Sequence, residues 1–101
     1  MKLYIDTSDT DKIILGINDK KFETNARNEK SQKLLTFLEE VLKKENFELA
    51  DIREIKVHTG PGSFTGLRVG ISVANTLGWT LGVPVNGKDL SKGEMTDLKY
   101  E

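Results

Sequence analysis

The sequence predicts an α/β fold in which one mixed β-sheet carries two helices on the same face. Short segments that alternate polar and apolar residues predict strands, and two longer segments with a helical period predict helices. Their order along the chain is β-β-β-α-β-α-β. The length of 101 residues fits one domain. It is too short for the two lobes that close around a substrate in most kinases and sugar-phosphate ATPases.

Three strands are expected at the N-terminus. Residues 2–6 alternate polar and apolar side chains, and residues 12–18 repeat the pattern. The turn-forming residues 7–11 between them predict a hairpin. Asn18 and Asp19 predict a second tight turn into a third strand, residues 20–25, whose charges suit the edge of a sheet.

A first helix is expected over residues 28–46. Its apolar stripe is formed by Leu34, Leu38, Val41 and Leu42, with Leu35 beside them. Asn28 and Ser31 are equally placed to cap its start. The lysines at positions 43 and 44 suit the negative end of the helix dipole.

The second half of the chain predicts a strand, a helix and a strand. Ile55 and Val57 mark the fourth strand, and a helical period returns from about Phe64 to Leu81. Residues 83–85 complete a mixed five-stranded sheet as a short last strand. Right-handed crossover connections then place both helices on the same face of the sheet.

The strand alternation predicts that only one face of the sheet is covered. The apolar side chains of one face are those of Leu3, Ile5, Ile13, Leu15, Ile17, Ile55, Val57, Val83 and Val85. The other face is mixed: Lys2, Tyr4, Asp6, Lys12, Ile14, Gly16, Lys56 and His58. A sheet covered on both sides is apolar on both. We therefore expect a two-layer α/β sandwich with a mostly solvated back face.

The composition excludes several classes of protein. The absence of cysteine excludes disulfides, thiolate metal sites and a cysteine nucleophile, and one histidine excludes a histidine-rich metal cluster. Fifteen basic against sixteen acidic residues leave no basic footprint for a stand-alone nucleic-acid binder. The longest apolar run, residues 13–17, is too short for a membrane span. The N-terminus lacks the long apolar stretch of a signal peptide, so we expect a cytoplasmic protein. We also expect no bound metal and no cofactor.

The strongest local signal is the glycine-rich run from Thr59 to Gly66. It does not match a P-loop, because leucine and arginine follow the last glycine in place of lysine and a hydroxyl residue. It does not match a dinucleotide loop, because its last glycine lies one residue too far along. An anion at the helix N-terminus remains one interpretation. The spacing favours a structural one, in which glycines permit positive φ, Pro61 stiffens the turn and Ser63 or Thr65 caps the helix.

Small residues recur every four positions along the second helix: Gly66, Gly70, Ala74, Gly78 and Gly82. Each glycine inside a helix costs about 1 kcal/mol relative to alanine, so the stripe has a packing reason. The stripe can pack on the chain's own sheet or first helix, or it can pack on a helix of a partner.

Three isolated residues carry weaker signals. Asp6 could act as a metal or acid–base carboxylate, although an aspartate before Thr-Ser more often caps a turn. His58 ends a strand on the polar side and more often has a solvated or capping role than a catalytic one. Trp79 is expected to be buried or at an interface, because no basic cluster surrounds it.

Three motifs look like the bacterial TsaB (YeaZ) family. They are Ile5-Asp6-Thr7-Ser8, Ser31-x-x-Leu34-Leu35 and Gly60-Pro-Gly-Ser-Phe-Thr-Gly-Leu-Arg-Val-Gly-Ile71. The last is nearly diagnostic, whereas the first is shared by the actin-like ATPase superfamily. The match covers residues 2–87 and corresponds to the family's N-terminal lobe, which is ribonuclease H-like. Residues 88–101 would then form a short polar tail.

The resemblance implies a role in making the threonylcarbamoyl modification of tRNA adenosine. In this family the TsaB-like protein is not the catalyst. It binds its paralogue TsaD, which transfers the group, through the two helices of the N-terminal lobe. It also helps to assemble a complex with the ATPase TsaE, and tRNA is contacted only indirectly. Without its partner the exposed helical face is expected to form a homodimer.

The resemblance also assigns candidate residues. The expected partner interface is Leu35, Leu38 and Leu42 on the first helix and Gly70, Ala74 and Gly78 on the second. The family loop, with an anion-binding or structural role, is Gly60, Pro61, Gly62, Ser63, Phe64, Thr65, Gly66 and Arg68.

The chain departs from the family pattern in three ways. Lys30 stands where the family usually has histidine, and neither a helix covering the back of the sheet nor a second lobe is visible. The polar back face favours a protein that is naturally this short. Nucleotide binding by Asp6, Thr7 and Ser8 is therefore only the alternative function, together with the loop from Gly60 to Gly66. No Ser/His/Asp spacing supports a protease.

Overall fold

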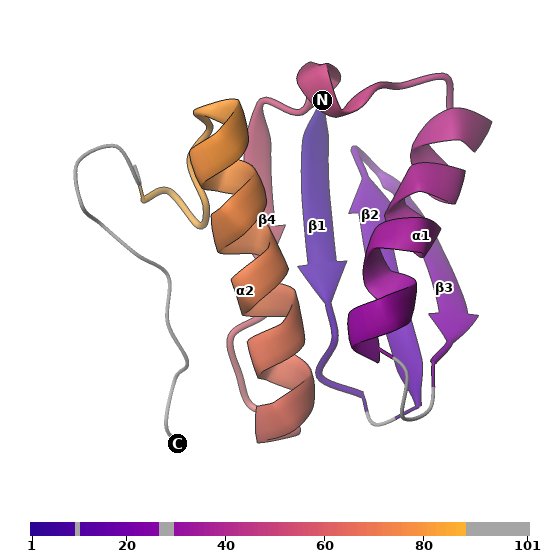
Figure 1. Ribbon diagram of the computed structural model, residues 1–101, viewed down its shortest axis with the longest axis vertical. Coiled ribbons are helices and arrows are strands. Elements are labelled where there is room, and N and C mark those ends of the chain that lie inside the picture. The colour runs from indigo at the N-terminus through magenta and orange to yellow at the C-terminus, as the bar shows by residue number, and fades with distance from the viewer. Residues whose placement is uncertain (10, 27–29, 89–101) are drawn as a thin grey trace.

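The structure has two layers, a mixed β-sheet and a pair of helices packed on one of its faces (Figure 1). This computed structural model describes residues 1–9, 11–26 and 30–88. The strands are β1 (Lys2–Asp6), β2 (Lys12–Ile17), β3 (Lys20–Asn25) and β4 (Glu54–Val57). The helices are α1 (Lys30–Lys44) and α2 (Phe64–Leu81), with a short 3-10 helix, η1 (Leu49–Asp51), before β4.

The sheet has the strand order β3-β2-β1-β4. β2 is antiparallel to both β1 and β3, and β1 is parallel to β4, which confirms the mixed sheet. Asn18, with a φ of 53°, starts the tight turn between β2 and β3. Its Oδ1 accepts a hydrogen bond of 3.1 Å from the Lys2 backbone N–H, so this turn is fastened to the start of β1.

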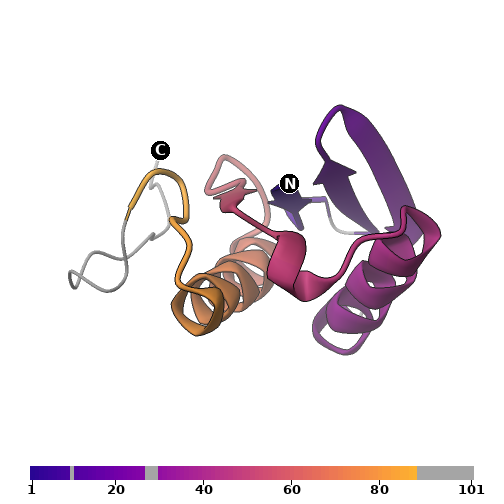
Figure 2. The same ribbon diagram turned by 90° about the horizontal axis from the view of Figure 1, so that it is seen from above.

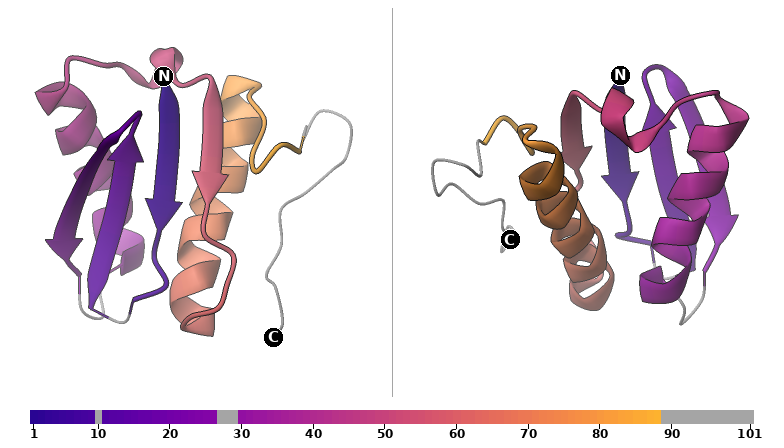
Figure 3. Two further views of the ribbon diagram at one scale, coloured as in Figure 1. Left: turned by 180° about the vertical axis from the view of Figure 1, so that it is seen from behind. Right: turned by 45° about the horizontal axis from the view of Figure 1, so that its top comes forward.

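The core lies between the sheet and the two helices, as the strand alternation predicts. Every residue expected on the inward face is buried except Val83, which is half-buried. Both helices lie on the same side of the sheet when it is viewed from above (Figure 2). Seen from behind, no described element covers the back face (Figure 3), so the prediction of a one-sided sheet is confirmed.

The described part of the first helix runs from Lys30 to Lys44, within the predicted range. Of its two candidate caps, Asn28 lies outside the described residues. Ser31 lies inside the first turn, where its hydroxyl donates to Gln32 Oε1 at 3.0 Å. Ser31 is therefore not the N-cap. The basic residues predicted for the last turn are in place.

The expected fifth strand is the main error in the predicted fold. Among the residues that the structure describes, Val85 makes one isolated parallel bridge, to Ile55, and the sheet has four strands. Asn86 and Gly87, with φ values of 51° and 78°, reverse the chain immediately afterwards and pair Val85 with Lys88. The dipeptide Asn-Gly is a strong signal for a two-residue turn. This signal was present in the sequence and it ends the strand.

The side chain of Asn86 replaces the missing strand residues at the edge of β4. Its Oδ1 accepts from the Val57 N–H at 2.8 Å, and its Nδ2 donates to the Val57 carbonyl at 3.0 Å. Its backbone N–H donates to the Ile55 carbonyl at 2.9 Å. The outward backbone groups of β4 are thus satisfied without a further strand.

These contacts predict the stability of an Asn86→Gly variant. Glycine tolerates the positive φ but removes both side-chain bonds to Val57, so the free energy of unfolding should fall by about 1–2 kcal/mol. The matched control is Asn46→Gly, where Asn46 has a φ of 61° and is exposed. Urea unfolding should show little loss, or a gain, for the control. Equal losses for the two variants would contradict the role of the Asn86 carboxamide.

Candidate functional site at the carboxyl end of the sheet

The two sequence segments proposed for nucleotide binding meet at the carboxyl end of the parallel strands β1 and β4. β1 and β4 are parallel, so the residues after β1 and the glycine-rich loop after β4 emerge together. The Ser63 N–H donates to the Ser8 carbonyl at 3.2 Å. A Cβ at Gly62 would lie 2.5 Å from the Ser8 Cβ, so this contact requires glycine.

Thr7 connects β1 to the first turns of α2. Its side chain is 1% exposed, and its hydroxyl donates to the Gly66 carbonyl and accepts from the Gly70 N–H at 3.1 Å. A Cβ at Gly70 would lie 2.6 Å from this hydroxyl oxygen. At Gly70, therefore, the small-residue stripe serves the close approach of α2 to its own sheet.

The Asp6 carboxylate caps the turn that follows β1. Its Oδ1 accepts from the Ser8 N–H at 2.9 Å and from the Ser8 hydroxyl at 2.6 Å. The Tyr4 hydroxyl donates to the other carboxylate oxygen at 3.4 Å. Burial raises the pKa of Tyr4 above its ordinary value of 10.0, and the negative charge and hydrogen bond of Asp6 raise it further. The turn-capping interpretation of Asp6 is confirmed.

The glycine-rich loop has the structural features that its spacing favours. Gly60 has a φ of 143°, and the bond from Gly60 to Pro61 is cis. Ser63, not Thr65, is the N-cap of α2, and its hydroxyl oxygen accepts from the Gly66 N–H at 3.4 Å. His58 Nε2 lies 2.9 Å from the Pro61 carbonyl, a contact within the loop.

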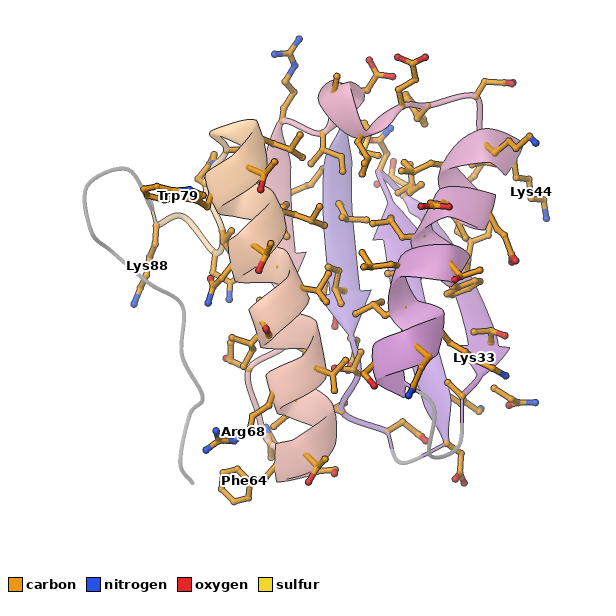
Figure 4. The ribbon with its side chains drawn as sticks, viewed as in Figure 1. Lys33, Lys44, Phe64, Arg68, Trp79 and Lys88 are labelled. Atoms are coloured by element: carbon orange, nitrogen blue, oxygen red, sulfur yellow. The ribbon has the colours of Figure 1, made fainter. Side chains whose placement is uncertain are left out.

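Three residues of the family loop, Phe64, Thr65 and Arg68, are exposed at the start of α2. Phe64 is 53% exposed, and Arg68 extends into solvent beside it (Figure 4). Within residues 1–9, 11–26 and 30–88, no group of three or more histidine, aspartate or glutamate side chains could hold a metal ion. The polar atoms of Asp6 and Thr7 bind this chain's own turn and helix, so the arrangement positions α2 against the sheet.

The structure corrects the expected partner surface. Five of its six residues are buried in this chain's own core: Leu38, Leu42, Gly70, Ala74 and Gly78. Only Leu35, at 48% exposure, lies on the surface. The leucine stripe of α1 is buried because it is the apolar side of that helix. On α2, Gly70 lets the helix approach the sheet closely.

A groove between the two helices is a feature that the sequence analysis missed. It is lined by Ser31, Thr65, Arg68, Val69, Ser72 and Val73. The two valines are only partly buried, and Leu35 lies one helical turn after Ser31 on the same side of α1. The signal for this groove was the pair of valines four residues apart, away from the glycine stripe. Trp79, expected to be buried or at an interface, is 69% exposed (Figure 4).

Comparison with known proteins identifies the family. The sequence model of the family "TsaD: tRNA N6-adenosine threonylcarbamoyltransferase" matches residues 23–87, more than half of the chain. A protein of Buchnera aphidicola, "tRNA threonylcarbamoyladenosine biosynthesis protein TsaB", is 33% identical over 89 residues, which are 84% of this chain and 42% of that protein. The chain belongs to the TsaB (YeaZ) family.

Further relatives agree with this assignment. The protein of the same name from Bacillus subtilis is 47% identical over 36 residues, covering 36% of this chain and 16% of that protein. The structure "YeaZ from Pseudomonas aeruginosa" superposes with a TM-score of 0.69 at 28% identity, over 83% of this chain and 40% of that one. This TsaB-family chain thus spans at most about two fifths of the length of these relatives. None of its described helices is long and apolar enough to cross a membrane.

The contact between Thr7 and Gly70 predicts the effect of Gly70→Ala. Alanine favours a helix by about 1 kcal/mol, but its methyl group would overlap the Thr7 hydroxyl. Overpacking typically costs about 1–3 kcal/mol, so we expect a net destabilisation. In a Thr7→Ala background the same substitution should cost little or stabilise the protein. A double-mutant cycle by urea unfolding measures this coupling, and strictly additive effects would contradict it.

The raised pKa of Tyr4 predicts a pH effect on stability. The folded state retains the phenolic proton more strongly than the unfolded state. This contribution is complete below the unfolded pKa, near 10.0, and is lost as pH rises through the folded pKa. The stability difference between the native chain and Tyr4→Phe should therefore decrease above that pH. The tyrosinate absorbance of a Tyr100→Phe variant isolates Tyr4, and a pKa at or below the ordinary value would exclude the effect.

Proposed function

We propose that this chain takes part in the biosynthesis of tRNA threonylcarbamoyladenosine as a non-catalytic subunit. Support comes from its relatives, which carry the name "tRNA threonylcarbamoyladenosine biosynthesis protein TsaB". The family motif from Gly60 to Ile71 has a structural use in this chain, because it caps α2 and packs against the turn after β1. No catalytic step needs to be assigned to it.

The proposed partner is a TsaD-like protein, and the proposed docking surface is the groove between α1 and α2. Leu35 and the partly buried Val69 and Val73 supply its apolar contacts. Ser31, Thr65 and Ser72 surround them with hydroxyl groups, and Arg68 adds a positive charge. An apolar centre with a polar rim is the usual construction of a protein–protein interface. This groove is the observation that carries the proposal.

We propose that the TsaD-like partner also links this chain to the other members of the complex. A TsaE-like ATPase would join through the complex, and tRNA would be contacted only indirectly. The near-zero net charge of −1 fits a subunit that leaves RNA binding to its partners. The cytoplasm is the compartment in which tRNA modification would occur.

Nucleotide binding is the second candidate function. The observation in its favour is the meeting of Asp6, Thr7 and Ser8 with the loop at the N-terminus of α2. Against it, the Thr7 hydroxyl is buried, and both Asp6 and Ser8 already make hydrogen bonds within the turn. Calorimetric titration with ATP and magnesium separates the two candidates. Saturable binding at micromolar concentration, lost in Asp6→Ala, would favour the nucleotide-binding function.

The partner proposal predicts the effect of charge in the groove. Leu35→Glu and Val73→Glu, one on each helix, should each weaken binding to the TsaD-like protein of the same genome at least tenfold. The reason is that a carboxylate would be desolvated in an apolar contact. Lys56→Glu, exposed on the back of the sheet, is the control and should bind normally.

Co-purification and calorimetry on folded variants provide the measurement, with circular dichroism to verify folding. The buried Ala74 is not a useful probe, because a charge there would unfold the chain. Unchanged affinity in both groove variants would refute docking at the groove. Absence of any complex with the native chain would refute the partner role itself.

A further inference from the structure

Two large aromatic side chains of α2 are exposed and take no part in the proposed partner groove. Trp79 is 69% exposed, the highest value among the exposed large hydrophobic side chains of the described residues, and Phe64 is 53% exposed. Neither lines the groove between α1 and α2. Tryptophan is enriched at the centres of binding surfaces, so the exposure of Trp79 indicates a surface that something covers.

The exposed aromatic side chains lie on one side of α2 together with Arg68. Phe64, Arg68 and Trp79 are separated by four and eleven residues, which is about one and about three turns at 3.6 residues per turn. These side chains and that of Lys88 project from the side of α2 that faces away from α1 (Figure 4). The four residues are called the outer flank of α2 below.

The outer flank carries positive charge without a neighbouring acid on the helix. Arg68 lies between the two aromatic residues, and Lys88 lies at the Trp79 end, where both cations are exposed. No residue of α2 is acidic. A segment that fits this surface must bring apolar side chains for the aromatic rings and carboxylates for the cations.

The sequence that follows Lys88 has this chemistry. Residues 89–101 lie outside the described residues, and their sequence continues directly from the outer flank. Residues 94–101 contain three acids and one base. Met95 and Leu98 are the aliphatic residues of this stretch, and its acids are Glu94, Asp97 and Glu101. Apolar and acidic side chains thus alternate over a few residues, as the outer flank requires.

We propose that residues 94–101 bind the outer flank of α2 within the same molecule. Met95 and Leu98 would cover Trp79, and the carboxylates would face the cations of the flank. The occupant is therefore a segment of this chain, selected by charge complementarity and by its attachment at the Trp79 end of the surface.

The connection between Lys88 and this segment is long enough for such binding. Residues 89–93 span at most about 17 Å when extended. Arg68 and Trp79 are about 17 Å apart along the helix, at 1.5 Å per residue. The segment can therefore reach the part of the flank between these two residues while the described fold stays unchanged.

The covalent connection also permits a weak contact. A short flexible linker holds its segment at an effective concentration in the millimolar range. A contact that would be too weak between separate molecules can therefore be occupied most of the time. Its charge pairs are exposed, so salt should weaken it.

Trp79 is the only tryptophan of the chain, so its fluorescence reports directly on the outer flank. Acrylamide quenching is measured on the full 101-residue chain at low micromolar concentration. Leu98→Asp and Arg68→Glu should each raise the quenching constant about twofold or more, because each removes one part of the complementarity. Arg68 is three turns from Trp79, so its substitution does not change the surroundings of the indole directly.

Ser91→Asp is the matched control. It adds the same charge after Lys88 but outside residues 94–101, so the quenching constant should stay at the native value. Circular dichroism verifies that every variant is folded. High salt should raise the quenching constant of the native chain towards that of Leu98→Asp.

Three results would overturn the proposal. The first is a native chain in which Trp79 is quenched as readily as in Leu98→Asp. The second is protection that both Leu98→Asp and Arg68→Glu leave unchanged. The third is protection that disappears on dilution, which would place a second molecule on the flank. Because the isolated chain is measured, none of these results decides whether the α1–α2 groove binds a TsaD-like protein.

Discussion

The buried hydroxyl of Thr7 joins the end of β1 to the first turns of α2 by hydrogen bonds to Gly66 and Gly70. Its contact requires a helix surface without side chains at that point, which Gly70 supplies. Once α2 lies this close to the sheet, its glycine and alanine side becomes core. The opposite side of the helix, with Val69 and Val73, is left facing the groove beside α1.

The glycine-rich loop also holds α2 against the sheet, at the carboxyl end of β1 and β4. Gly62 allows the loop to pass directly over Ser8, and Ser63 then caps the helix that Thr7 holds. Asp6 completes the arrangement by closing the turn after β1. A motif with glycines before a helix can bind an anion, but its glycines can equally well allow the loop to pack closely on the rest of the chain. Here the polar atoms of Asp6 and Thr7 bind this chain's own turn and helix, which supports the structural use. Partner binding is therefore better supported than nucleotide binding as the function.

The two edges of the sheet illustrate how a small domain controls pairing. The Asn86 carboxamide hydrogen-bonds to the outer backbone groups of Val57 in β4, and Gly87 lets the chain turn away after one bridge. β3 stays open but carries alternating charges. Such charges discourage the edge from pairing with a further strand.

The sequence by itself determined the order of elements as far as α2 and the inward face of each strand, and it favoured the turn-capping role of Asp6, because periodicity and turn chemistry are local properties. It also determined the family, through the run from Gly60 to Ile71. Only the tertiary structure decided that Leu38, Ala74 and their neighbours belong to the core and that Val73 stays partly exposed in the groove. A helical stripe reveals its own composition but not what it packs against. The orientation of α2 depends on the distant Thr7, fifty-nine residues before Gly66, and no local pattern records that contact.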